Sequence, residues 1–264
     1  MRPLATVARR PTFWVEAGVA GAWGLLVMLA LRPGGAAASP APAQGQLWVC
    51  MTEMAGMGSA AAGRAAGHVA AAGFFAPLTG TLPMLALMAA AMMLPPALPA
   101  VGYVAVNSFY WRRRRAVVEF LVVFVAVWVA YDLTVLTALD RAGLGSWPLA
   151  PAAALALGAI WQLTPWKRRA LQACHRTRAL PPKGWRATAG VADFGLRNGG
   201  ACVVSCWAMM LTTAFVGLPG VVWMAALTGL ITVERLSEKP RRAARRVAMA
   251  LAAGAAVAVA IGLL

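Results

Sequence analysis

Residues 112–138 read RRRRAVVEFLVVFVAVWVAYDLTVLTA, four arginines followed by a long, predominantly apolar run. Such a run crosses the hydrocarbon core of a bilayer as a helix, for which about 20 residues are needed. Clustered arginines beside a membrane helix favour the cytoplasmic side. The stretch therefore predicts a membrane helix that starts at the cytoplasmic face.

Apolar segments of this kind recur along the whole chain. Of the 264 residues, 61% are hydrophobic and only 12% are charged, which is more apolar surface than a soluble protein of this size can bury. We therefore predict an all-α fold, a polytopic transmembrane helical bundle of about seven spans. The predicted spans are 13–31, 78–106, 116–138, 149–166, 198–217, 219–236 and 246–264.

The positive charge of the chain lies between these spans. The net charge of +16 comes from short basic runs that alternate with apolar segments, which is typical of cytoplasmic loops and not of a nucleic-acid-binding tail. With the N-terminus in the cytoplasm, 21 of the 24 Lys and Arg residues fall on the inner side. We predict a multi-pass protein of the plasma membrane with its C-terminus outside and no nucleic-acid partner.

Three regions follow from this topology. Residues 1–31 form an N-terminal anchor span, although a basic start and a small-residue stretch after the apolar run also occur in cleaved signal peptides. Residues 32–77 form an extracytoplasmic, methionine-containing loop, and residues 78–264 a six-span membrane domain. Within that domain the basic segment 170–196 predicts a cytoplasmic interfacial loop with Trp185 at headgroup level.

Residues 201–211, ACVVSCWAMML, place sulfur on one face of the fifth span. Residues three and four apart share a helix face, so Cys202, Cys206, Met209 and Met210 form a stripe of two thiols and two thioethers. Buried sulfur also serves as ordinary packing. Soft sulfur ligands favour Cu(I), so the stripe is a candidate metal site.

The second span carries a similar stripe of methionines. Met84, Met88 and Met92 recur every four residues, with Met93 beside the last. Packing alone explains such a stripe, but both spans place sulfur at a comparable depth, so we expect the two sets to meet. Prolines in the LPPALP segment, residues 94–99, remove backbone donors and predict a kink or an end of the helix.

A third sulfur group lies in the outer loop, where CMTEMAGMG contains Cys50, Met51, Met54 and Met57. A loop rich in Ala, Gly and Pro has no core for methionines to fill, so we interpret this group as a metal-capture site. Because the cysteines are few and are predicted on opposite sides of the membrane, we expect no structural disulfide.

Acidic residues inside predicted spans are costly and indicate function unless they are paired. Glu119 opens the third span and Glu234 closes the sixth, each next to arginines with which an interfacial ion pair is the simplest interpretation. Asp132 has no basic neighbour in sequence, which favours a protonated carboxyl or a polar partner on another span.

Four segments in order, MAAAMMLPPALP, WQLTPWKRRALQAC, FGLRNGGACVVSCWAMM and VVWMAALTGLITVERL, resemble a bacterial family of predicted metal-binding integral membrane proteins, sometimes labelled copper chaperone-like. The resemblance covers roughly residues 80–245 and implies location in the bacterial inner membrane. It implies ligands at Cys202, Cys206 and Glu234, with Trp207 and Cys174 retained. The family usually has a His at the position of Asn198 and further cysteines at the positions of Ala170 and Ser205.

Three functions fit these patterns. The first, which we expect, is a copper carrier or chaperone that uses Met and Cys ligands for Cu(I) and hands the ion to another membrane or extracytoplasmic protein. The second is a metal-dependent oxidoreductase or a subunit of one, for which two histidines are too few without a partner. The third is a metal-free assembly or scaffold protein. No nucleotide-binding loop or hydrolase motif is present.

Overall fold

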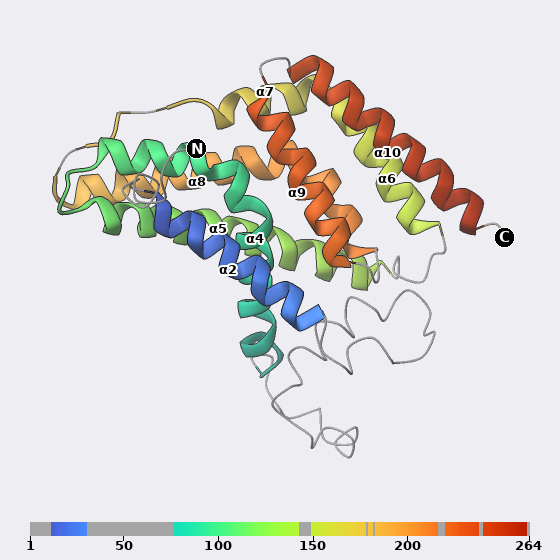
Figure 1. Cartoon of the computed structure of the whole chain (residues 1–264), viewed down its shortest axis with the longest axis horizontal. Coiled ribbons are helices and arrows are strands. Elements are labelled where there is room, and N and C mark those ends of the chain that lie inside the picture. Colours follow the sequence, from blue (N-terminus) through green and yellow to red (C-terminus); the bar gives the residue numbers. More distant parts are fainter. Residues whose placement is uncertain are drawn as a thin grey trace, which may run out of the picture.

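The computed structural model describes residues 12–30, 76–142, 149–177, 179–181, 183–215, 220–237 and 240–262. In these parts of the chain all regular structure is helical, which confirms the predicted all-α class (Figure 1). In chain order the elements are α2 (Phe13–Ala30), α4 (Ala76–Asn107), α5 (Arg113–Arg141), α6 (Ala150–Leu163), α7 (Pro165–Cys174), α8 (Gly184–Leu211), the 3₁₀ turn η4 (Thr212–Ala214), α9 (Gly220–Leu236) and α10 (Pro240–Gly262).

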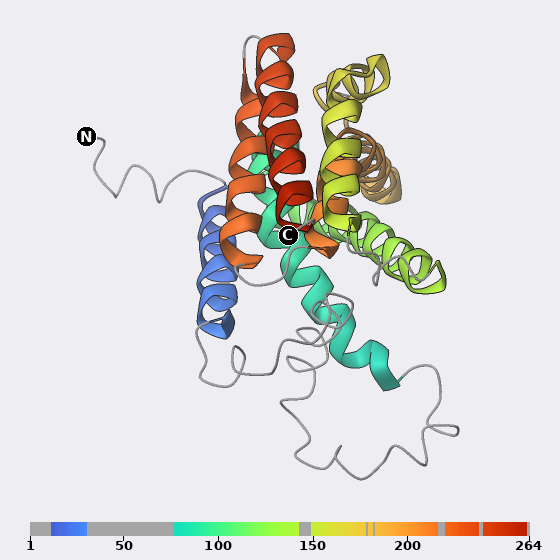
Figure 2. The same ribbon diagram turned by 90° about the vertical axis from the view of Figure 1, so that its right-hand side faces the viewer.

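The helices pack as two neighbouring groups. α6 and α10 lie side by side along most of their length, and α9 runs beside α10 (Figures 1 and 2). α5 packs between α4 and α8, and α7 folds back onto α8. α8 therefore contacts both groups, through α5 on one side and through α6 and α7 on the other.

The contact between α5 and α8 sets the position of α8. Phe120, Phe124 and Trp128 recur every four residues on α5 and are fully buried. On α8, Gly195 and Gly199 let the two backbones approach, since a Cβ atom at either glycine would lie 3.2 Å from a Val side chain of α5. Small residues at such contacts are the usual device for close helix packing in membranes.

Three helices of the described residues are long and apolar enough to cross a membrane: Leu82–Asn107, Arg113–Leu139 and Arg241–Ala260. They correspond to the predicted spans 78–106, 116–138 and 246–264. Phe13–Met28 and Ala150–Leu163 are shorter apolar helices. The count of seven spans and the direction of the chain thus stay predictions.

The prediction of an interfacial loop over residues 170–196 is wrong. Most of the segment is helical, because α7 extends to Cys174 and α8 already begins at Gly184. The reason is local: Ala187, Val191 and Phe194 recur at helical spacing and are buried, so this stretch has an apolar face that its basic residues obscured. The predicted start of the fifth span at 198 is therefore the middle of a longer helix.

The prolines of α4 bend the helix without ending it. The helix continues from Ala76 to Asn107 through four prolines, and its axis changes direction part-way (Figures 1 and 2). Because Pro95 has no N–H, the carbonyl of Ala91 loses its helical donor. Trp23 of α2 replaces that donor, with its Nε1 atom 2.8 Å from the Ala91 oxygen.

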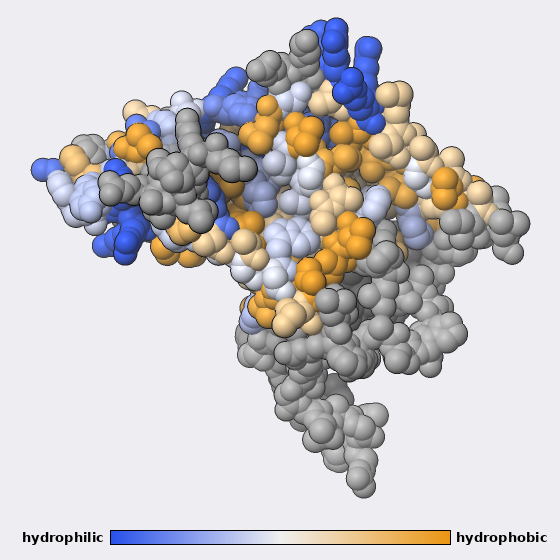
Figure 3. Space-filling model, in the orientation of Figure 1, coloured by the Kyte–Doolittle hydropathy of each residue, from blue (hydrophilic) through white to orange (hydrophobic). Residues whose placement is uncertain are grey.

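On the face shown in Figure 3, hydrophilic residues gather around α7 with the start of α10, and around the meeting point of α4 and α5. Apolar residues, mixed with residues of intermediate hydropathy, lie over α9 and α10. Exposed apolar surface on this scale marks contact with a membrane or a protein. The large exposed apolar side chains include Val122, Ile160, Leu163, Val222, Val233, Met249 and Val257.

Candidate metal site

The sulfur residues of α8 are buried inside the helix bundle. Cys202, Cys206, Met209 and Met210 are each at most 4% exposed. Residues 202 and 206 lie one helical turn apart, and their thiols interact with each other. The apolar packing around them keeps water from the two thiols.

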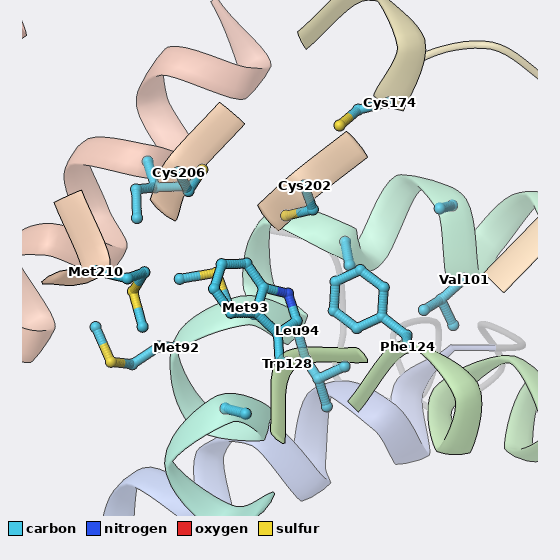
Figure 4. Close-up of a cluster of buried hydrophobic side chains, with 14 of the residues drawn as sticks. Met92, Met93, Leu94, Val101, Phe124, Trp128, Cys174, Cys202, Cys206 and Met210 are labelled. Atoms are coloured by element: carbon cyan, nitrogen blue, oxygen red, sulfur yellow. The ribbon is translucent and has the colours of Figure 1, made fainter. Parts of the chain in front are cut away.

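Methionines of α4 reach the same buried cluster. Met92 and Met93 are fully buried and belong to one continuous core cluster with Cys202, Cys206 and Met210. Figure 4 shows the side chains of Met92, Met93 and Met210 pointing toward a common region, with Cys206 above them. The structure therefore brings together the inner methionines of α4 and the sulfur residues of α8.

The outer methionines of α4 are placed differently. Met88 is partly buried and packs against the cluster, whereas Met84 is half-buried and lies outside it. Cys50, Met51, Met54 and Met57, the predicted capture site, lie outside the described residues.

The two methionines of α8 face different surroundings. The Met209 Sδ atom accepts from Gln162 Nε2 of α6 at 2.8 Å and lies 3.8 Å from Lys167 Nζ of α7. Met210 instead faces the methionines of α4 (Figure 4). Consecutive residues point about 100° apart on a helix, so the single predicted stripe is split between an apolar and a polar side of α8.

Glu234 lies on the polar side and has a partner that the sequence did not suggest. Its Oε2 atom is 2.9 Å from Lys167 Nζ and 3.4 Å from Gln162 Nε2, and both charged side chains are at most 3% exposed. Its Oε1 atom has no protein partner among the described residues. The interpretation of Glu234 as an interfacial partner of Arg235 is thus wrong, because α7 supplies the cation across the bundle.

Arg235 turns toward the thiols instead. Its Nη1 atom lies 3.4 Å from Cys202 Sγ, and its Nη2 atom donates to Asn198 Oδ1 at 2.9 Å. The side chain is buried, so a fixed positive charge stands beside Cys202. Sequence reasoning did not assign Arg235, Lys167 or Gln162 to the site. Lys167 belongs to a basic run that predicts a cytoplasmic loop, and Arg235 is interpreted from the sequence as the ion-pair partner of Glu234.

Ser205 and Cys174 extend the cluster toward α7. Ser205 Oγ lies 3.3 Å from Cys206 Sγ and donates to the Cys202 carbonyl at 2.8 Å. The Cys174 thiol interacts with Ser205, and burial raises its pKa to about 11 although the Arg235 charge opposes the shift. Cys174 is therefore a neutral thiol at pH 7.

The junction of α7 and α8 also holds the positions at which the resemblance places further ligands. Ala170 is buried one turn before Cys174, and Asn198 and Ser205 are buried on the face of α8 that carries the two thiols. This chain has a methyl group, an amide and a hydroxyl at these three places.

His175 lies at the exposed edge of this junction. Partial burial, with the Arg235 charge in the same direction, lowers the pKa of its imidazole. The ring is therefore neutral at pH 7, the form that binds metals. Cys174, which is buried, and His175, which is exposed, are two neighbouring side chains of the junction with donor atoms that bind soft ions.

The donor set suits a soft ion that needs few ligands. No three His, Cys, Asp or Glu side chains within the described residues are placed to hold a metal ion together. Two thiols with nearby thioethers are a donor set that suits soft ions, Cu(I) among them.

The comparison with known families agrees with this chemistry. A family model described as copper chaperone, PpoB2, matches residues 82–258. The chain belongs to this copper chaperone family. The match covers α5 to α9 and most of α4 and α10, and it confirms the resemblance found in the sequence. No curated protein and no solved structure matches the chain.

Proposed function

We propose that this member of the copper chaperone family is a multi-pass protein of the bacterial inner membrane that binds Cu(I) and hands it to a partner. The observation that carries the proposal is that the buried thiols of Cys202 and Cys206 belong to one buried cluster with the thioethers of Met92 and Met93 from a second helix. Met210 completes the apolar side of the site, and Met209 borders the polar side.

The ligand types suit transfer more than storage. Thiolates hold Cu(I) firmly, whereas thioethers are weak, neutral ligands that exchange easily. A thiol pair next to several thioethers therefore offers an arriving or departing ion a series of alternative partners. A buried site also keeps bulk water from a bound ion.

The membrane part of the proposal rests on charge and length. Three described helices are long and apolar enough to span, two more are apolar but shorter, and the large exposed apolar side chains would face lipid. Seven spans with a cytoplasmic N-terminus leave 21 of the 24 Lys and Arg residues inside. In that arrangement the α7–α8 junction lies at the cytoplasmic side.

A route for the ion follows from the same arrangement. Cys50, Met51, Met54 and Met57 would capture copper outside the cell, a step that rests on the sequence alone. Met84 and Met88 would pass it along α4 to the thiols of α8. Glu234 would act as a charge partner of Lys167, because the Lys167 ammonium group already binds one of the Glu234 carboxylate oxygens.

Cu(I) competition titration of the purified protein in detergent, against a chromogenic Cu(I) chelator, tests the proposal. Changing both Cys202 and Cys206 to Ser should lower the affinity of the inner site by at least about 100-fold, or about 2.8 kcal/mol. Met249→Leu, which removes an exposed thioether of α10, is the matched control and should leave the affinity unchanged. A double serine variant that binds as tightly as the wild type would refute the inner site, whereas a wild-type protein that binds no Cu(I) would favour a metal-free scaffold.

A gain-of-function variant makes the test stronger. Ser205 Oγ already lies 3.3 Å from Cys206 Sγ, so Ser205→Cys would add a third thiol beside the pair. We expect tighter Cu(I) binding by about tenfold or more. Unchanged affinity in this variant would mean that the ion does not bind on this side of Cys206.

A further inference from the structure

Arg235 is a buried cation whose partners are not carboxylates. Its guanidinium contacts the Cys202 thiol at 3.4 Å and the Asn198 amide oxygen at 2.9 Å, and the side chain is 6% exposed. The neighbouring carboxylate, Glu234, forms its ion pair with Lys167 instead. Among the described residues, Arg235 has no Asp or Glu within ion-pair distance.

The charges of the buried cluster therefore do not cancel. Lys167 and Glu234 neutralise each other at 2.9 Å, which leaves the single positive charge of Arg235 beside the thiols. A guanidinium keeps its proton at any physiological pH, so this charge is permanent. Burial of an uncompensated charge is costly, and the cost is removed by a negative group at the same place.

A metal bound to both thiols changes this balance in a way that depends on its charge. Binding releases the two thiol protons to solvent, and the two thiolates then carry two negative charges. With a monovalent ion the metal and its two thiolates have a net charge of −1, which Arg235 cancels. With a divalent ion they are neutral, and Arg235 remains uncompensated.

We propose that Arg235 makes the Cys202–Cys206 site selective for monovalent over divalent soft ions. The inference rests on the proposed Cu(I) site and adds the property by which that site would reject divalent metals. The ligand types alone do not provide it, because thiolates also bind divalent soft ions. Asn198 contributes by holding the guanidinium in place through its Oδ1 atom.

The test compares two probe ions that share a preference for two sulfur ligands and differ in charge, Ag(I) and Hg(II). Competition of each ion between the purified protein and a small-molecule thiol gives the ratio of the two affinities. Arg235→Met removes the charge and should shift this ratio toward Hg(II) by at least about tenfold. Arg235→Lys keeps a cation and should retain most of the wild-type ratio.

A second variant reaches the same charge balance without loss of the arginine. Asn198→Asp places a carboxylate at the Oδ1 position, 2.9 Å from Arg235 Nη2 in the present structure, and should shift the ratio in the same direction. Arg197→Met is the matched control on α8, since Arg197 is exposed and pairs with Asp193, and it should leave the ratio unchanged.

The outcomes separate the two proposals. If Ag(I) binds equally well after both cysteines are changed to Ser, the copper site itself is refuted. If Ag(I) and Hg(II) both require the cysteines but neither Arg235→Met nor Asn198→Asp moves the ratio, the site stands and the charge selection by Arg235 is overturned.

Discussion

Glu119 and Glu234 occupy similar places in the sequence and very different places in the structure. Each lies near the end of an apolar segment with arginine nearby. Glu119 binds Arg112 and Arg115, both from its own segment and each at 2.8 Å, and its side chain is 17% exposed. Glu234 is 3% exposed and binds Lys167, from a different helix, at 2.9 Å.

The difference shows how burial changes the partner of a charge. At the edge of the bundle, where solvent screens the charges, the cations next in sequence suffice for Glu119. Inside the bundle a carboxylate must have a partner with good geometry, and α7 provides one for Glu234. This leaves Arg235 free to face the thiols, so the ion pair of Glu234 also determines the electrostatics of the candidate site.

The largest expected effect comes from breaking the buried pair. Lys167→Met leaves Glu234 as an unpaired charge in the interior and should destabilise the protein by about 3–5 kcal/mol. Thermal unfolding in detergent, followed by tryptophan fluorescence, measures the loss.

The double variant Lys167→Met/Glu234→Met is the control for this prediction. It removes both charges together and should recover most of the lost stability, since apolar replacements of a buried pair are often neutral. Equal destabilisation in the single and double variants would show that packing of the lysine stem, and not the charge of Glu234, causes the loss.

An intermediate effect is expected at Cys174, which tests how well the junction excludes water. Burial raises the pKa of this thiol to about 11, so the reactive thiolate is scarce below that pH. Alkylation of Cys174 by iodoacetamide, followed by peptide mass spectrometry, should therefore accelerate about tenfold per pH unit between pH 8 and 10. An ordinary cysteine levels off near pH 9, so a plateau there would contradict the burial of the junction.

The same shift has a consequence for stability. The folded protein holds the Cys174 proton up to about pH 11, whereas the unfolded chain releases it near pH 9. The contribution of the Cys174 thiol to the free energy of unfolding is thus complete below pH 9 and is lost as the pH rises from 9 to 11.

The smallest effect is expected at Glu119, the more exposed of the two acids. Glu119→Gln removes two partly solvated ion pairs and should cost about 1 kcal/mol or less. Arg112 keeps its bond to Thr188 at 2.7 Å in this variant. A loss as large as that of Lys167→Met, in the same unfolding measurement, would show that the two acids are not distinguished by burial.

Sequence reasoning recovered the elements whose signal is local. The apolar runs gave α4, α5 and α10, the sulfur residues 202–210 lie on one helix although Met209 and Met210 face different surroundings, and the prolines of α4 bend it as predicted. It failed between 170 and 196, where short apolar repeats are diluted by basic residues and the helical periodicity is hard to recognise. The assignment of any of these sulfur residues as a metal ligand stays a prediction.

By itself the sequence determined that the chain is apolar enough for a membrane, that its positive charges gather between apolar segments, and that sulfur residues lie on two helices. These properties depend on composition and on the repeat of a helix, both of which are local. Only the tertiary structure decided that Lys167, 67 residues from Glu234, neutralises that acid, and that Arg235, 33 residues from Cys202, faces its thiol. The physical reason is that a buried charge is stabilised by whichever group packing brings within a few ångströms, and packing joins residues that are distant in the chain.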